Sequence, residues 1–176
     1  MSGPHAVLVG PPGAGKTTVG MLLADRLRLP FRDADQDIEV TAGRAIADIF
    51  TTDGEPAFRS LEEQAIEAAL AEHTGVLSVG GGAVLSERTR RLLREHRVVF
   101  LNVGLAEGMR RTGMSTARPL LAGVNPRATF RALLTARLPL YREVATLEVL
   151  TDDLKTDEVA DAVLRALAGQ PETAEK

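Results

Sequence analysis

A stretch near the N-terminus has the residue types and spacing needed to bind the phosphates of a nucleotide. Residues 10–17 read GPPGAGKT and match the pattern G-x-x-x-x-G-K-[ST] at every fixed position. In such a loop the ammonium group of Lys16 contacts the β- and γ-phosphates, and the hydroxyl of Thr17 binds Mg²⁺. The residues that we assign to nucleotide binding are Gly13, Ala14, Gly15, Lys16, Thr17 and Thr18.

The surroundings of this loop favour a functional phosphate site over an ordinary glycine turn. The apolar run at 6–9 precedes the loop, and a helical pattern over 18–27 follows it. A loop between a buried strand and a helix aims backbone amides and the positive end of the helix dipole at an anion.

Two aspartates follow the next short apolar run. Asp33 and Asp35 lie two residues apart, so in an extended chain their side chains share one side. One carboxylate is suited to holding Mg²⁺ through water, and the other to accepting a proton from a hydroxyl and orienting it for phosphoryl transfer. The alternative is an acidic cluster that caps a helix, and we favour that interpretation for Asp37 only.

A second group of residues could bind an acidic substrate. Arg59 and Glu62 lie three apart on a predicted helix and can pair, although the same spacing fits a solvated surface bridge equally well. A guanidinium held by a carboxylate is suited to bidentate binding of a second carboxylate. Gly80, Gly81 and Gly82 follow the apolar run at 76–79, so their amides can approach a ligand closely. The alternative for these glycines is a tight strand-to-helix turn.

Two further arginines lie later in the chain. Arg118 falls within 112–126, where glycines and prolines interrupt the pattern and predict a mobile excursion. An arginine on a closing lid can neutralise charge on a transferring phosphoryl group, and Arg137 on the following helix can reach the same site. Taken singly, each arginine is more typical of a solvated surface.

The alternation of apolar runs and helical patterns predicts an α/β fold. We expect three layers, with a parallel sheet of five strands flanked by helices and ligands bound at the carboxyl ends of the strands. We also expect Asp53 to cap the helix through 58–70, and Pro139 to bend or end the helix over 128–141. The strands are expected at 6–9, 29–33, 76–79, 98–101 and 147–150.

Composition narrows the class of protein. The 176 residues are 44% apolar and carry a net charge of −3, which predicts one domain over 1–168 with a flexible tail over 169–176. This charge gives no reason to expect nucleic acid or a membrane as a partner. No cysteine is present, so disulfides and thiolate catalysis are excluded. With neither a signal peptide nor a long apolar span in the sequence, we expect a soluble cytoplasmic protein and a monomer.

Together these pieces resemble the shikimate kinase family over nearly the whole chain. The phosphate loop, the aspartates, the Arg59–Glu62 pair, the triple glycine, RPLL at 118–121 and R-x-P-x-Y at 137–141 stand in that family's order and spacing. The resemblance implies a P-loop kinase fold with a mobile lid over about 113–125 and a shikimate-binding region over about 33–62. It also implies Mg²⁺ as cofactor and the reaction of ATP with shikimate to give 3-phosphoshikimate and ADP, on the way to chorismate and the aromatic amino acids.

The resemblance also implies residue roles. Arg59, Arg137 and a glycine amide of 80–82 hold the shikimate carboxylate, while Glu62 braces Arg59. Asp35 binds the ring hydroxyls and orients the attacking one. Lys16, Thr17 and, through water, Asp33 bind the phosphates and Mg²⁺. Arg118 reaches the site when the lid closes, and Arg111 stacks on adenine. One loop departs from the family, because 151–156 reads TDDLKT where relatives often place basic or proline residues.

Two other functions remain as alternatives. A gluconate kinase or related small hydroxy-acid kinase would share the scaffold, but the triple glycine and RPLL at 118–121 argue against it. A non-catalytic nucleotide-binding regulator would be expected to lack Lys16 or the acceptor carboxylate, and both are present.

Overall fold

A parallel sheet of five strands forms the centre of the molecule. The computed structural model describes residues 3–112 and 125–169, and within them the strand order is β2-β3-β1-β4-β5 with every pairing parallel. This confirms the predicted α/β class and strand number. The strands are β1 (Ala6–Val9), β2 (Phe31–Asp33), β3 (Val76–Ser78), β4 (Val98–Asn102) and β5 (Leu147–Leu150).

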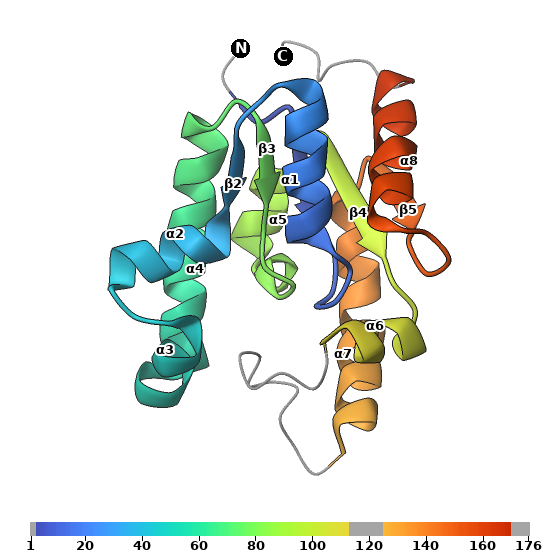
Figure 1. Cartoon of the computed structure of the whole chain (residues 1–176). Helices are drawn as coiled ribbons and strands as arrows, with labels where there is room; N and C mark the ends of the chain where they lie inside the picture. The colour runs from blue at the N-terminus through green and yellow to red at the C-terminus, as the bar shows by residue number, and fades with distance from the viewer. Residues whose placement is uncertain (1–2, 113–124, 170–176) are drawn as a thin grey trace.

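Helices cover both faces of this sheet, as Figure 1 shows, and give the three predicted layers. On one face lie α1 (Lys16–Leu27) and α8 (Thr156–Ala168), and on the other α4 (Glu55–Glu72), α5 (Glu87–Leu93) and α7 (Pro126–Val144). The alternation along β1 explains both layers, because Leu8 packs toward α1 and α8 while Val7 and Val9 pack toward the other helices.

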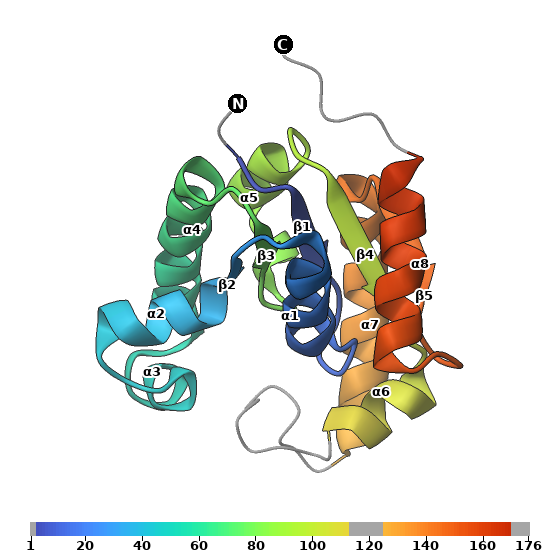
Figure 2. The same cartoon turned by 45° about the horizontal axis from the view of Figure 1, so that its top comes forward.

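The remaining elements flank the carboxyl ends of the strands. Helices α2 (Ala34–Ala42) and α3 (Ile46–Asp53) pack on α4 through Ile38, Ile49 and Phe58. The short 3-10 helix η1 (Ala83–Leu85) follows β3, and α6 (Leu105–Thr112) follows β4. Figure 2 shows α2 and α3 on one side of the sheet and α6 on the other. None of the helices in the described ranges is long and apolar enough to cross a membrane.

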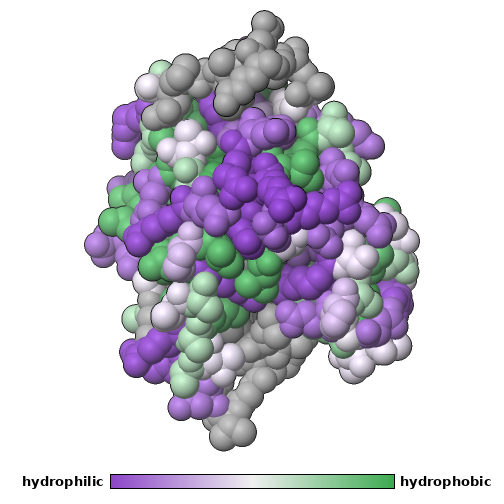
Figure 3. All heavy atoms as spheres, turned by 180° about the vertical axis from the view of Figure 1, so that it is seen from behind, coloured by the Kyte–Doolittle hydropathy of each residue, from purple (hydrophilic) through white to green (hydrophobic). Residues whose placement is uncertain are grey.

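The outer surface of one helical layer is strongly polar. Seen from behind, hydrophilic side chains form a broad band across the middle of the molecule (Figure 3). Helices α4, α5 and α7 cover that side of the sheet, and ion pairs join them: Arg88 of α5 binds Glu67 of α4, and Arg90 of α5 binds Glu143 of α7.

The aspartates that follow β2 lie at the start of a helix and not in an extended chain. Helix α2 begins directly after Asp33, whose carboxylate accepts a hydrogen bond of 2.9 Å from the amide of Asp35 and caps the helix. Asp37 does not cap it but accepts a 2.6 Å bond from Arg32, so our capping assignment for Asp37 was wrong. Asp33 and Asp35 do not share an extended segment, because the cap starts the helix directly after Asp33.

Two other helix boundaries differ from prediction. Gly54 rather than Asp53 is the N-cap of α4, since the chain turns there with a φ of 87°, which glycine adopts most easily. Pro139 does not end α7, which continues to Val144 because Tyr141 and Val144, beyond the proline, are buried in the core. Of the predicted lid, 113–124 lie outside the described residues, and Asn125 caps α7. The predicted tail lies outside them from 170 onward.

Because Pro139 is exposed inside a helix, it should cost stability. Pro139→Ala restores a backbone N–H to α7, and we expect the free energy of unfolding in urea to rise by about 1–3 kcal/mol. Arg131→Ala, at an exposed position of the same helix, is the control and should stay within about 0.5 kcal/mol. A less stable Pro139→Ala variant would mean that the ring makes contacts worth more than the lost hydrogen bond.

Candidate functional site

The loop between β1 and α1 forms an anion cradle at the carboxyl end of the sheet. Gly13 and Gly15 have φ values of 84° and 86°, which favour glycine. Gly15 is the N-cap of α1 and offers no side-chain cap, so the first amides of the helix point at the space in front of the loop. The ammonium group of Lys16 donates to the carbonyls of Gly10 at 2.7 Å and Pro11 at 3.1 Å and lies over the same loop.

Two oxygen-bearing side chains lie beside this cradle. The hydroxyl of Thr17 donates to Oδ2 of Asp33 at 3.2 Å, while Oδ1 of Asp33 holds the start of α2. In the described part of the chain no three or more acidic, histidine or cysteine side chains group as a metal site. A hydroxyl and a carboxylate next to a phosphate cradle fit Mg²⁺, which takes few protein ligands and completes its shell with phosphate and water.

A cavity of about 740 Å³ opens in front of the cradle. Its walls include Lys16, Thr17, Asp33 and Asp35, and its far end is formed by the 152–156 loop after β5. That loop is attached to the chain after β4, because the amide of Gly104 donates to Asp152 Oδ1 at 2.7 Å. The departure noted in the sequence therefore lines the cavity itself. No role was predicted for Asp152 within that loop, although its place directly after a strand was a signal.

The glycine turn after β3 lies between the cradle and α4. A Cβ on Gly81 would lie 2.9 Å from Cδ of Pro12 in the phosphate loop. A Cβ on Gly80 would lie 2.8 Å from oxygens of both Asp35 and Glu62, and one on Gly82 would meet the guanidinium of Arg59. Each glycine thus permits a different close approach, which an ordinary turn would not require.

Arg59 and Glu62 form a largely buried ion pair. Their side chains are 19% and 4% exposed, and NH1 of Arg59 donates to Oε1 of Glu62 at 2.8 Å. The surface-bridge alternative is thereby excluded. Nε of Arg59 and Oε2 of Glu62 are buried without a partner among the described residues. Leaving such atoms unpaired costs about 1–3 kcal/mol each, so the arrangement favours a polar ligand.

Arg137 completes this side of the site. It is 6% exposed, and burial lowers the pKa of its guanidinium, while Tyr141 opposes the fall and the charge of Arg59 adds to it. The two guanidinium groups thus lie close enough to repel each other, beside Glu62. An anion placed between them would relieve that repulsion. We call Arg59, Glu62, Arg137 and the glycine turn the acid pocket.

Most of the predicted site residues come together at this edge of the sheet, and two do not enter the described structure. Arg118 lies outside the described residues, as does the side chain of Arg111. Tyr141 is part of the R-x-P-x-Y pattern and no role was predicted for it, although its hydroxyl donates to the carbonyl of Gly81 at 2.6 Å. The one signal in the sequence was spacing: Tyr141 lies one helical turn after Arg137, so the two side chains share the helix face that is directed at the site.

Comparisons with known proteins agree with this geometry. The family model described as shikimate kinase matches residues 12–168. A shikimate kinase of Saccharopolyspora erythraea is 70% identical over 161 residues, which cover 92% of each chain. The solved structure of a shikimate kinase from Acinetobacter baumannii in complex with shikimate has a TM-score of 0.91 at 37% identity, covering 96% of this chain and 94% of that one. A gluconokinase from Sinorhizobium meliloti, at 21% identity and a TM-score of 0.55, shares the fold alone.

The buried carboxyl of Glu62 gives a test through pH. Burial raises its pKa above the usual 4.5, and the charge of Arg59 opposes the rise. The folded chain therefore holds this proton more tightly than the unfolded chain, so this group's contribution to stability falls as pH rises from 4.5 through the raised value. Glu62→Gln lacks this titration. We expect the Tm of the variant minus that of the wild type to increase across this window.

Thermal unfolding at several pH values between about 4 and 8 measures this difference. Glu67→Gln, whose carboxylate pairs with Arg88 at the surface, is the exposed control. A Tm difference that stays constant or shrinks with rising pH for Glu62→Gln would contradict the raised pKa.

Proposed function

Because this chain belongs to the shikimate kinase family, we propose that the residues brought together here transfer the γ-phosphoryl group of ATP to the 3-hydroxyl of shikimate, giving 3-phosphoshikimate and ADP. The observation that carries the residue assignment is the position of Asp35. Its side chain lines the cavity in front of the phosphate loop and also approaches Gly80 beside Glu62. One carboxylate therefore faces both the nucleotide side and the acid pocket.

We assign the carboxylate of shikimate to the acid pocket. Arg59 is held by Glu62, so its planar guanidinium is oriented before the substrate arrives. Arg137 supplies a second positive charge, and an amide of the glycine turn supplies a donor. The amides of Gly81 and Gly82 donate no hydrogen bond to any residue that the structure describes, which leaves them suited to this role.

Asp35 would orient the attacking hydroxyl and accept its proton. In a loose phosphoryl-transfer transition state the nucleophile needs little activation, so the main contribution of Asp35 is to aim the hydroxyl oxygen at the γ-phosphorus. Lys16 and the amides at the start of α1 would bind the phosphates. When bound beside Thr17 and Asp33, Mg²⁺ would supply positive charge to the β- and γ-phosphate oxygens.

Neither alternative function gains support. Similarity to the gluconokinase is limited to the fold, and Lys16 and Asp35, which a catalytically inactive regulator would be expected to lose, both face the cavity. An ADP-release assay with shikimate and then gluconate separates the three functions. Turnover with gluconate alone selects the first alternative, and nucleotide binding without turnover selects the second. A monomeric state, a cytoplasmic location and the roles of Arg111 and Arg118 stay predictions.

Removing a guanidinium from the acid pocket should weaken substrate binding selectively. We expect Arg137→Ala to raise the KM for shikimate about 10- to 150-fold, because a charged hydrogen bond is worth about 1.5–3 kcal/mol, while the KM for ATP changes little. Arg131→Ala, exposed on the same helix, is the matched control. An unchanged KM for shikimate in Arg137→Ala would place the carboxylate elsewhere.

Replacing the carboxylate that faces both sites should affect the chemical step. Asp35→Asn keeps the shape of the side chain but removes its charge, and we expect kcat to fall about 100-fold or more while ATP binding is retained. Asp37→Asn, two residues on and paired with Arg32, controls for the loss of one negative charge in α2. Wild-type turnover by Asp35→Asn would remove this residue from the mechanism.

A further inference from the structure

The glycine turn contains one peptide group whose orientation glycine alone does not determine. The amide of Ala83 donates to the carbonyl of Gly80 at 3.1 Å, and Gly82 has φ −96° and ψ 3°. These are the features of a type I turn with Gly81 and Gly82 at its centre. A type II turn differs by a flip of the central peptide and needs a positive φ at its third residue, which Gly82 could adopt without steric cost.

Tyr141 binds the carbonyl of that central peptide. Its hydroxyl donates to the oxygen of Gly81 at 2.6 Å, its side chain is fully buried, and its ring stacks on Phe100 with centroids 4.9 Å apart. In a trans peptide the carbonyl and the following N–H point in opposite directions, and the described chain has no cis peptide. The amide of Gly82 therefore points away from the Tyr141 hydroxyl, and the guanidinium of Arg59 lies against Gly82.

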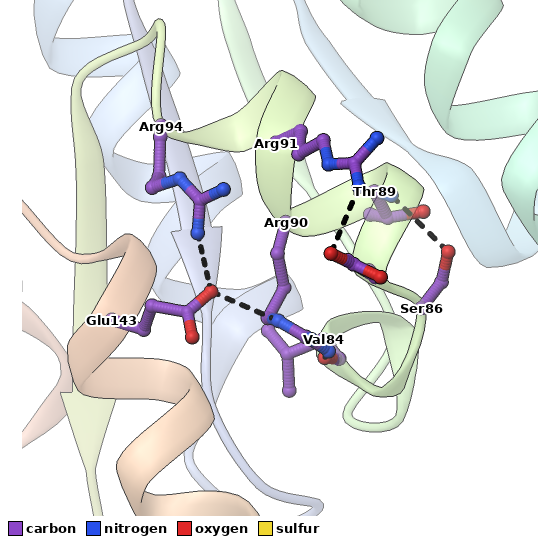
Figure 4. Close-up of polar contacts among 8 residues, drawn as sticks. Val84, Ser86, Thr89, Arg90, Arg91, Arg94 and Glu143 are labelled. Atoms are coloured by element: carbon purple, nitrogen blue, oxygen red, sulfur yellow. Dashed lines mark hydrogen bonds and ion pairs between the residues drawn. The ribbon is translucent and has the colours of Figure 1, made fainter.

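A second contact fixes the turn to the same helix. Figure 4 shows Arg90 of α5 between η1 and α7, where its guanidinium donates to the carbonyl of Val84 at 2.8 Å and to Glu143 at 2.9 Å. Arg94 donates to the same carboxylate oxygen at 2.5 Å. Glu143 lies two residues after Tyr141 on α7, so the turn and η1 are attached to this helix at two points.

We propose that Tyr141 is a positioning residue: its hydroxyl selects the type I orientation of the Gly81–Gly82 peptide and thereby makes the turn a donor, not an acceptor, toward the acid pocket. Without this hydroxyl the peptide is free to flip, and a flipped peptide would place the carbonyl oxygen of Gly81 where the Gly82 amide now lies. A carbonyl there would repel a carboxylate. Arg90 and Glu143 keep α7 at the distance that the Tyr141 hydrogen bond requires. The inference rests on the proposed binding of shikimate in this pocket.

Tyr141→Phe tests the proposal because it keeps the ring that stacks on Phe100 and removes only the hydroxyl, with its hydrogen bond to Gly81 and its interaction with Arg137. We expect the dissociation constant for shikimate, measured by calorimetry without nucleotide, to rise about 3- to 10-fold, as for the loss of one hydrogen bond. The KM for shikimate should rise with it, and the dissociation constant for ADP should stay within about twofold of the wild-type value.

Thr146→Val is the matched control. Its hydroxyl accepts a hydrogen bond from the amide of Val98 at 3.1 Å. Thr146 directly precedes β5, so it lies at the amino ends of the strands, whereas the glycine turn lies at their carboxyl ends. It should lose stability without a change in shikimate binding. Normal shikimate affinity in a folded Tyr141→Phe, or equal weakening of shikimate and ADP, would overturn the proposal. Failure of the wild type to bind shikimate at all would instead refute the proposed function.

If Tyr141→Phe does not fold, Arg90→Gln tests the same arrangement from outside the pocket. Arg91→Gln is its neighbour on α5 and serves as the control, since the ion pair that Arg91 makes among the described residues is with Glu87, at an exposed surface position. We expect Arg90→Gln to raise the KM for shikimate at least threefold while Arg91→Gln leaves it unchanged. Equal KM values for the two variants would refute the attachment of the turn to α7.

Discussion

The backbone of the glycine turn packs directly on the phosphate loop, against the ring of Pro12. A Cβ on Gly81 would lie 2.9 Å from the ring of Pro12, which has little freedom to move. This contact fixes the distance between the phosphate cradle and the acid pocket. The rest of the site depends on it, because phosphoryl transfer requires the attacking oxygen and the phosphorus to approach within contact distance.

Burial of charged side chains in the acid pocket costs free energy, and it also makes the pocket favour a negatively charged ligand. Glu62 and Arg137 are each almost wholly buried. Burial raises the pKa of Glu62 and lowers the pKa of Arg137, and both shifts favour the neutral form of the side chain. Arg59 pairs with Glu62 and, at 3.4 Å, with Glu55, which offsets part of that cost, but the guanidinium of Arg137 still lies close enough to Arg59 to repel it. A substrate carboxylate between the two guanidinium groups would relieve that repulsion, whereas a neutral polyol would leave it in place.

The sequence predicted the sheet, its five strands and the phosphate loop because each depends on a local pattern. It placed Arg59 beside Glu62 correctly from helical spacing, yet spacing could not distinguish a buried pair from a surface bridge, since burial is set by α2, α3 and the glycine turn packing around α4. The start of α2 was misassigned because Asp33 and Asp37 are equally good capping residues by type. The contact between Tyr141 and Gly81 joins positions 60 residues apart, and no local pattern encodes it.

The two carboxylate oxygens of Asp33 have different hydrogen-bond partners. Oδ1 accepts the amide of Asp35 and Oδ2 faces the hydroxyl of Thr17. A cation that arrives and leaves with each nucleotide would compete only for the second oxygen. Repeated loading and unloading of the metal would then leave the first turn of α2, and with it the backbone that carries Asp35, protected from fraying.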